Sequence, residues 1–115
     1  MTPETLIDGV YLRFYTHLHA RHDGLLLSEW LLEQAKKHKL GGGSVFRAIA
    51  GFGRHGVLHQ EAFFELADDL PVKIEFLLRD SEADTLLDLV RRAGVELVYA
   101  REPASIGILG KESPA

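Results

Sequence analysis

Cysteine is absent from the 115 residues of this chain, and positively charged residues are in the minority. Without thiols, the chain has no disulfide bond, no thiolate nucleophile and no cysteine-based zinc site, and nothing indicates an oxidising compartment. The 13 Lys and Arg residues face 17 Asp and Glu residues, for a formal net charge of -4. A phosphate backbone needs a basic surface, so we expect no nucleic-acid partner.

Long apolar runs are also lacking. No run approaches the roughly 20 residues that cross a bilayer. The first ten residues have neither the basic nor the apolar region of a secretory signal. We therefore expect a cytoplasmic protein without membrane insertion. Hydrophobic residues make up 46% of the chain and charged residues 26%, which is typical of an ordered globular domain. We expect residues 1–115 to form a single domain with its core at about 9–100.

The first half of the chain alternates between two periodicities. Apolar and polar side chains alternate between residues 10 and 19, which predicts a half-buried strand. Apolar residues then recur at helical spacing between Leu27 and His38, with Asp23 as the expected N-cap and Gly41–Gly43 as the stop. The stretch "SVFRAIA", residues 44–50, is apolar on both faces and predicts a second strand in the interior of a sheet.

The second half repeats this order. Residues 71–78 predict a strand with one apolar face, made by Val72, Ile74, Phe76 and Leu78. A helix over 80–93 follows, capped by Asp80 or Ser81 and ended by Gly94. Residues 95–100 predict the last strand. The tail 101–115 is rich in Pro, Gly and Ser, so we expect a loop with a frayed end.

The order of these elements predicts an α+β fold, the ferredoxin-like βαββαβ sandwich. Its antiparallel sheet carries two helices on one face, and the excursion at 55–70 lies between the second and third strands. The other sheet face would be open. On the first strand this open side carries Tyr11, Arg13, Tyr15 and His17, an amphipathic set that suits coverage by other subunits. We therefore expect an oligomer, most simply a closed trimer.

Two groups of residues could bind a ligand. In "GFGRHG", residues 51–56, glycine N–H groups and Arg54 could contact an anion, or the glycines could simply shape a loop. Neither a P-loop nor a dinucleotide-binding motif is present.

In "HLHARH", His17 and His19 would point to one side of a strand. They could hold a divalent metal with His22, His59 or Glu61, or they could be ordinary polar residues at a strand end. No serine lies in "GxSxG", and Asp68 and Asp69 fit a solvated turn. The sequence therefore does not predict an enzyme.

"GGGSVFRAIAGFGRHG", followed after the excursion by "DLPVKIEFLL", resembles the PII-like signalling superfamily, and in particular its domain of unknown function 190 group. The resemblance implies a ferredoxin-like homotrimer that binds adenine nucleotides or other small effectors in clefts between subunits. It also implies that the excursion acts as a T-loop that docks on a membrane transporter, a channel or an enzyme.

The resemblance also implies roles for individual residues. Val45 is similar to a wall of the adenine pocket, Gly51, Gly53 and Arg54 to the loop base beside the phosphates, and His55 to a ligand-contacting position. Gly94 is similar to the glycine-rich turn before the last strand, where PII proteins carry "GDGK" and this chain has "RRAG" with Arg91 and Arg92. The hypothesis is a non-enzymatic PII-like regulator of a partner protein, with an adenine nucleotide as one possible effector. The alternative is a metal-binding ferredoxin-like trimer that uses His17, His19 and His22.

Overall fold

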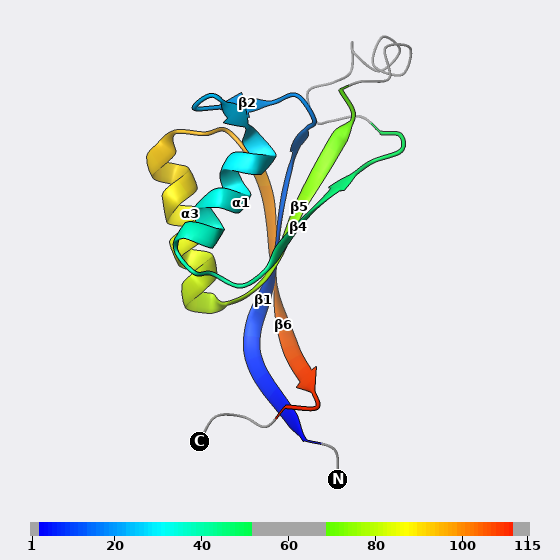
Figure 1. The fold of residues 1–115 in the computed structure, drawn as a ribbon, viewed down its shortest axis with the longest axis vertical. Coiled ribbons are helices and arrows are strands. Elements are labelled where there is room, and N and C mark those ends of the chain that lie inside the picture. The colour runs from blue at the N-terminus through cyan, green and yellow to red at the C-terminus, as the bar shows by residue number, and fades with distance from the viewer. Residues whose placement is uncertain (1–2, 52–68, 112–115) are drawn as a thin grey trace.

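The chain folds into one four-stranded antiparallel sheet with two helices against it (Figure 1). The computed structural model describes residues 3–51 and 69–111. The elements are β1 (Glu4–His17), β2 (Arg21–His22), β3 (Leu25–Leu26), α1 (Leu27–Lys37), β4 (Gly43–Arg47), β5 (Pro71–Arg79), α3 (Asp80–Ala93) and β6 (Val98–Leu109). The strand order β4-β5-β1-β6, with every neighbouring pair antiparallel, is that of the ferredoxin-like sandwich, and it confirms the predicted fold class.

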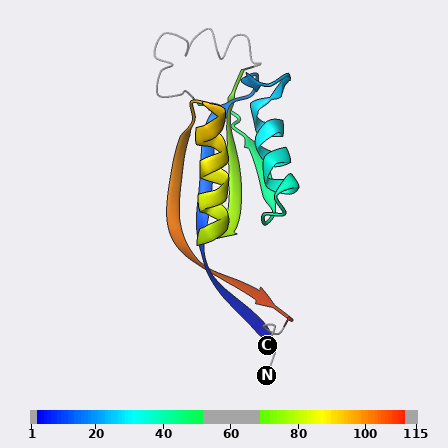
Figure 2. The same ribbon diagram turned by 90° about the vertical axis from the view of Figure 1, so that its left-hand side faces the viewer.

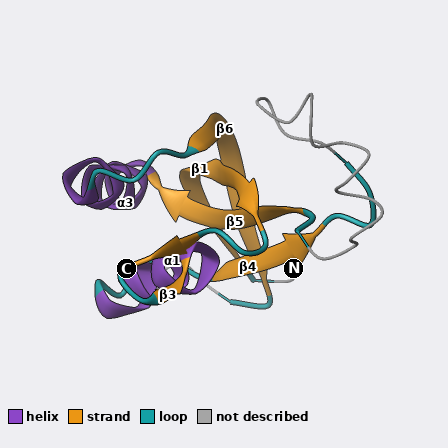
Figure 3. Cartoon of the chain, turned by 90° about the horizontal axis from the view of Figure 1, so that it is seen from above, coloured by secondary structure: helices purple, strands orange, loops and turns teal. Residues whose placement is uncertain are grey.

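The core lies between the sheet and the two helices, which cover the same sheet face (Figure 3). As the alternation predicted, every second residue is buried from Val10 to Phe14 of β1 and from Val72 to Leu78 of β5. Side chains of both helices, among them Leu31 and Leu86, pack against them. The buried strand residues are Val10, Leu12, Phe14, Val72, Ile74, Phe76 and Leu78. Within the described residues, no helix covers the opposite face of the sheet.

The ends of the helices differ in part from the predictions. Asp23 does not cap α1, which begins at Leu27; Asp23 instead adopts a positive φ of 54° in the β2–β3 turn, next to Gly24. Neither Asp80 nor Ser81 caps α3. There the Glu82 carboxylate accepts a hydrogen bond from the Arg79 N–H at 2.8 Å, which satisfies a donor at the start of the helix. Gly94 ends α3 in the left-handed conformation, as predicted.

β4 lies at the edge of the sheet, so the prediction of an interior strand is wrong. It pairs only with β5, and all five of its residues are exposed. Apolar residues on both faces of a strand normally indicate burial on both sides. Here they leave Val45 and Phe46 accessible on an edge that has no partner strand within the described residues.

The prediction of a loop tail is also wrong for residues 101–109, which continue β6 as far as Leu109. β6 pairs with β1 down to the pair Glu4 and Leu109, whereas the pairing of β1 with β5 stops at Gly9. Residues 4–8 and 105–109 therefore form a two-stranded extension, the β1–β6 ribbon, which projects beyond the helices (Figure 2). Pro103 is compatible with this strand because β6 is an edge strand, where a missing N–H need not break the ladder.

The three consecutive glycines before β4 have different surroundings. A Cβ on Gly43 would overlap the Phe76 ring, coming within 2.7 Å of its Cδ1 atom, whereas a Cβ on Gly42 would meet nothing within 4 Å. We therefore expect Gly43→Ala to lower the free energy of unfolding by about 1–3 kcal/mol, the usual cost of overpacking. Gly42→Ala should change it by less than about 0.5 kcal/mol. Urea unfolding of the two variants tests this, and equal midpoints would contradict it.

Candidate functional site

The candidate site lies at the end of the sheet where β1 and β4 finish and β5 and β6 begin. The strand register places Arg47 opposite Val72, His17 opposite Pro71 and Tyr15 opposite Val98. The turn after α3 reaches the same end, because β6 begins there (Figure 1). The antiparallel topology thus brings residues as far apart in the sequence as Tyr15 and Val98 to one end of the sheet. We call this end of the strands the loop end of the sheet.

Backbone hydrogen bonds hold the two chain segments that flank residues 52–68. The Ala48 N–H donates to the Pro71 carbonyl at 2.9 Å, and the Leu18 N–H donates to the Leu70 carbonyl, also at 2.9 Å. Gly51 lies against Pro71, since a Cβ at this position would come within 3.3 Å of the proline Cγ atom. The points at which the chain leaves the loop end and returns to it are therefore close together and fixed to the sheet.

Asp69 connects the returning segment to the end of β1. Its Oδ1 atom accepts a hydrogen bond from the His19 N–H at 2.9 Å, and its Oδ2 atom lies 2.8 Å from Nδ1 of His17. Asp69 lies in a bend with its side chain 39% exposed, in agreement with the expected solvated turn, and its carboxylate also bridges two positions of another segment. Sequence reasoning missed it because only the fold brings residues 17–19 beside residue 69.

The surroundings of Asp69 perturb its ionisation. Partial burial by itself would raise the pKa of Asp69, but the bonds from the His19 N–H and the His17 ring outweigh burial. They hold the pKa below its ordinary value of 3.8. The carboxylate form is thus the one that the folded chain stabilises.

This depressed pKa predicts how stability depends on pH. Since the unfolded chain takes up the Asp69 proton at a higher pH than the folded chain, the stabilisation should be complete above the ordinary value of 3.8 and should be lost as the pH falls through the lower folded value. Asp69→Asn lacks this titration. We therefore expect the stability difference between the wild type and Asp69→Asn to shrink as the pH is lowered from about 5, in urea unfolding at a series of pH values. A difference that stays constant with pH would contradict this.

The residues predicted from the PII resemblance that the structure describes lie at or near the loop end. Val45 is exposed on β4, opposite Ile74, and Gly51 follows that strand. Gly94 turns the chain with φ of 71° and donates its N–H to the Arg91 carbonyl at 3.1 Å. Arg92 forms a surface ion pair with Asp88 at 2.9 Å. Gly53, Arg54 and His55 lie outside the described residues, so their roles stay predictions.

The three histidines of the metal-binding alternative make separate contacts. His17 faces Asp69, His19 uses its backbone N–H, and the His22 ring packs edge-on against Trp30 with a centroid distance of 4.7 Å. Residues 3–51 and 69–111 contain no group of three or more His, Cys, Asp or Glu residues placed to hold a metal ion. His59 and Glu61, the other proposed ligands, lie outside the described residues. The described structure therefore does not bring His17, His19 and His22 together as ligands.

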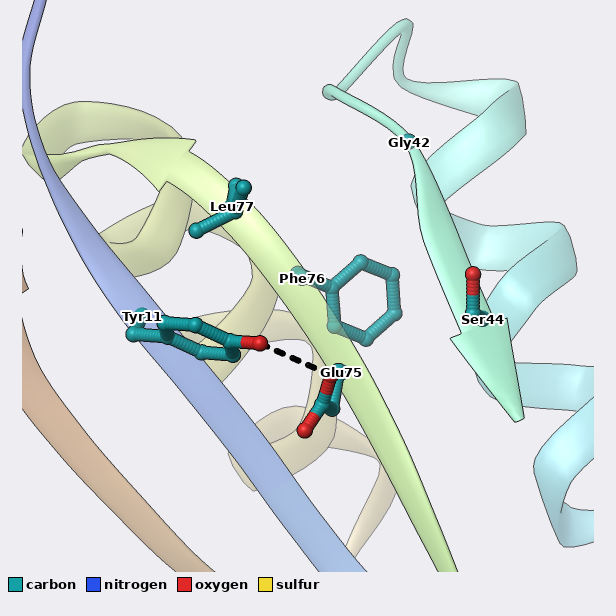
Figure 4. A pocket seen from close by; sticks show the side chains of 6 residues that line it. All are labelled: Tyr11, Gly42, Ser44, Glu75, Phe76 and Leu77. Atoms are coloured by element: carbon teal, nitrogen blue, oxygen red, sulfur yellow. Dashed lines mark hydrogen bonds between the residues drawn. The ribbon is translucent and has the colours of Figure 1, made fainter. Parts of the chain in front are cut away.

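Glu75 is the centre of a polar network on the open face of the sheet. It accepts a hydrogen bond from the Tyr11 hydroxyl at 3.0 Å (Figure 4). It also pairs with Lys73 at 2.6 Å and with Arg13 at 3.5 Å. Lys73 above all lowers the pKa of Glu75; burial opposes this shift, and Tyr11 and Arg13 reinforce it. Arg13 also pairs with Glu102 at 2.7 Å. The two cations and two carboxylates of this network therefore balance each other.

A shallow pocket adjoins this network. It has a volume of about 260 Å³ and is lined by Tyr11, Gly42, Ser44, Glu75, Phe76 and Leu77 (Figure 4). Of its polar side chains, Tyr11 and Glu75 are hydrogen-bonded to each other. Sequence analysis did not select Glu75, although its alternation with the core residues of β5 placed it on the open face.

Comparison with known proteins identifies the family. A model of DUF190, described as "Uncharacterized ACR, COG1993", matches residues 9–105. The chain belongs to the DUF190 family. It is also 31% identical over 96 residues to the UPF0166 protein of Aquifex aeolicus (strain VF5), an alignment that covers 76% of this chain and 91% of that protein. The recognition made from "GFGR" and the returning strand is thereby confirmed.

Solved structures show that this DUF190 chain has a PII-like fold. The apo form of CPII from Thiomonas intermedia K12, a nitrogen regulatory PII-like protein, superposes with a TM-score of 0.59 at 13% identity, covering 91% of this chain and 98% of that one. CPII bound to ADP and bicarbonate, from the same organism, superposes with a TM-score of 0.58 at 18% identity, covering 93% of each chain. At these identities the likeness concerns the fold. In the part of the DUF190 chain that the structure describes, neither helix is long and apolar enough to cross a membrane.

Proposed function

We propose that this DUF190 chain is a non-enzymatic PII-like regulator that works in the cytoplasm as a homotrimer. It binds a small anionic effector, with an adenine nucleotide as the first candidate, in clefts between neighbouring subunits. Through residues 55–70 it acts on a partner protein, a membrane transporter, a channel or an enzyme. The observation that carries this proposal is the loop end of the sheet, where the flanks of residues 52–68 and the turn at Gly94 converge.

The loop end explains how an effector could act on a partner. The flanking segments are tied to β1 and β5 by the hydrogen bonds of Ala48, Leu18 and Asp69, so any ligand held there contacts a rigid base. A ligand that binds one arrangement of residues 55–70 more tightly than another increases the population of that arrangement. CPII, which has a similar fold, binds ADP and bicarbonate, and this supports a nucleotide as the effector.

The open face of the sheet supports the assembly. It presents exposed apolar residues, among them Leu77 and Tyr15, beside a charge-balanced network. A balanced surface can face a second copy of itself without repulsion, whereas a surface of one charge could not. In the proposed trimer this face turns toward the other subunits, and the loop end lies at their junction.

Isothermal titration tests the effector. ATP, ADP, AMP and cyclic nucleotides are titrated separately, with and without bicarbonate, into the full chain. We expect at least one nucleotide to bind, and Arg54→Ala to weaken it at least about tenfold, which corresponds to about 1.4 kcal/mol. Lys37→Ala, on the exposed end of α1, is the matched control and should bind as the wild type does. No heat with any member of the panel, or equal affinity in Arg54→Ala, would overturn the nucleotide proposal.

A further inference from the structure

The β1–β6 ribbon exposes apolar side chains that nothing in the described chain covers. Leu6 is 65% exposed and Leu109 is 77% exposed. Both lie on the same side of the ribbon, because Leu6 pairs with Gly107 and Glu4 pairs with Leu109. Glu4 and Asp8 lie on this side as well, so two acidic groups flank the two leucines.

The ribbon is nevertheless well formed. Its tip is closed by a hydrogen bond from the Gly110 N–H to the Pro3 carbonyl at 2.8 Å, and by one from the Thr5 hydroxyl to the Lys111 carbonyl at 2.8 Å. Two strands without a third strand or a helix are marginally stable in water. An ordered ribbon with two exposed leucines is therefore best explained as an element that packs against another surface.

The end of β4 has the complementary properties. Val45 and Phe46 are exposed, and Ile49 just beyond the strand is 98% exposed. Arg47 lies on the same side of β4 as Val45, because the two residues are opposite Val72 and Ile74, whereas Phe46 lies on the other side, opposite Lys73. Arg47 is exposed and forms no ion pair with any residue of 3–51 or 69–111. The ribbon presents leucines flanked by acidic groups, and this side of β4 presents an apolar residue beside a basic group.

The ribbon and the end of β4 lie at opposite ends of the sheet. Gly9 pairs with Arg79, the last residue of β5, and the ribbon begins beyond this pair. Arg47 pairs with Val72, which lies near the first residue of β5. The structure is 54 Å long (Figures 1 and 2). A ribbon therefore cannot reach β4 of its own copy, and contact between the two surfaces has to join different copies.

We propose that the ribbon of one copy docks on the end of β4 of the next copy, with Leu6 and Leu109 against Val45 and Ile49 and with Glu4 and Asp8 facing Arg47. A head-to-tail contact of this kind forms a ring when the rotation closes. The inference deepens the trimer of the proposed function and rests on it. It also places the neighbouring ribbon beside Gly51, so that each site at the loop end is completed by a second copy.

Charge reversal tests the docking. The double variant Glu4→Arg with Asp8→Arg should dissociate, because its new arginines would face Arg47 across the interface and like charges repel. We expect the dissociation constant of the oligomer to rise at least about tenfold, measured by light scattering after size-exclusion chromatography. Arg47→Glu alone should dissociate in the same way. Combining Arg47→Glu with the double variant should restore the assembly. Arg91→Glu, at the end of α3, is the matched control and should restore nothing.

Each outcome decides between the proposals. A monomeric wild type would overturn both the docking and the trimer of the proposed function. An oligomeric wild type whose charge variants keep their mass would overturn the docking alone, and restoration by Arg91→Glu in place of Arg47→Glu would do the same. Should the charge variants fail to fold by circular dichroism, Leu6→Ala with Leu109→Ala removes only the apolar contact. This milder variant should still dissociate, and an unchanged mass would overturn the docking.

Discussion

Replacing Phe76 by alanine is expected to lower the free energy of unfolding by about 3–5 kcal/mol, the usual range for a large aromatic residue in a closed core. Phe76 is 1% exposed on β5, an interior strand of the sheet. Its ring meets Phe14 of β1 edge-to-face at a centroid distance of 6.1 Å, and on its other side it occupies the space that a side chain on Gly43 would need. The cavity would therefore open between three strands at once.

Urea unfolding at a fixed protein concentration measures this loss. The matched control is Glu33→Ala, an exposed position on α1 where alanine favours the helix and the stability should change by less than about 0.5 kcal/mol. A loss below about 1 kcal/mol in Phe76→Ala would show that the sheet and helices close around the cavity, and would contradict the rigid core described here.

Replacing Leu77 by aspartate is expected to dissociate the oligomer while leaving each copy folded. Leu77 adjoins Phe76 on the same strand but points to the open face, where it is 46% exposed. In a subunit interface the new carboxylate would lie beside Glu75, which already pairs with Lys73 and Arg13. An unpaired buried charge costs about 3–5 kcal/mol, which would weaken assembly by two orders of magnitude or more.

Light scattering across a series of protein concentrations measures the change, and circular dichroism confirms that the separated copies remain folded. Lys37→Asp introduces the same side chain on the exposed end of α1 and should leave the mass unchanged. An oligomer of Leu77→Asp as stable as the wild type would show that the open face is not a subunit contact. If the ribbon variants still dissociated in that case, the contact at β4 alone would hold the copies together.

Phe76 and Leu77, neighbours on β5, thus have opposite roles, in the core and on the open face. The sequence predicted such differences correctly. The alternation of Val72, Ile74, Phe76 and Leu78 identified the core face without any structure, because a strand sends successive side chains to opposite sides. The stripe on α3 and its glycine stop were predicted for the same reason: side-chain direction follows from local geometry. The order of the elements then led to the ferredoxin-like sandwich.

The errors concern properties that local geometry does not determine. β4 resembles an interior strand in its residues, yet it is an edge strand, because its place depends on which strands pair in the whole sheet. Residues 101–109 carry Pro and Gly, which favour loops locally, but the extended β1 offers a full ladder of partners, and pairing overrides propensity. Asp69 lies in a bend as expected, but its bonds to His17 and His19 were not predicted, because only the fold brings these segments together.

The sequence by itself determined the class of protein. Its periodicities specified the order of the main strands and helices, its lack of cysteine excluded disulfide bonds and thiolate sites, and "GFGR" with its returning strand identified the family. The tertiary structure alone decided which residues meet: the segments that flank the loop, the Glu75 network on the open face, and the ribbon that lies far from the end of β4. The physical reason is the sequence separation of the contacts. Periodicity reflects contacts within a few residues, whereas sheet pairing joins residues across nearly the whole chain.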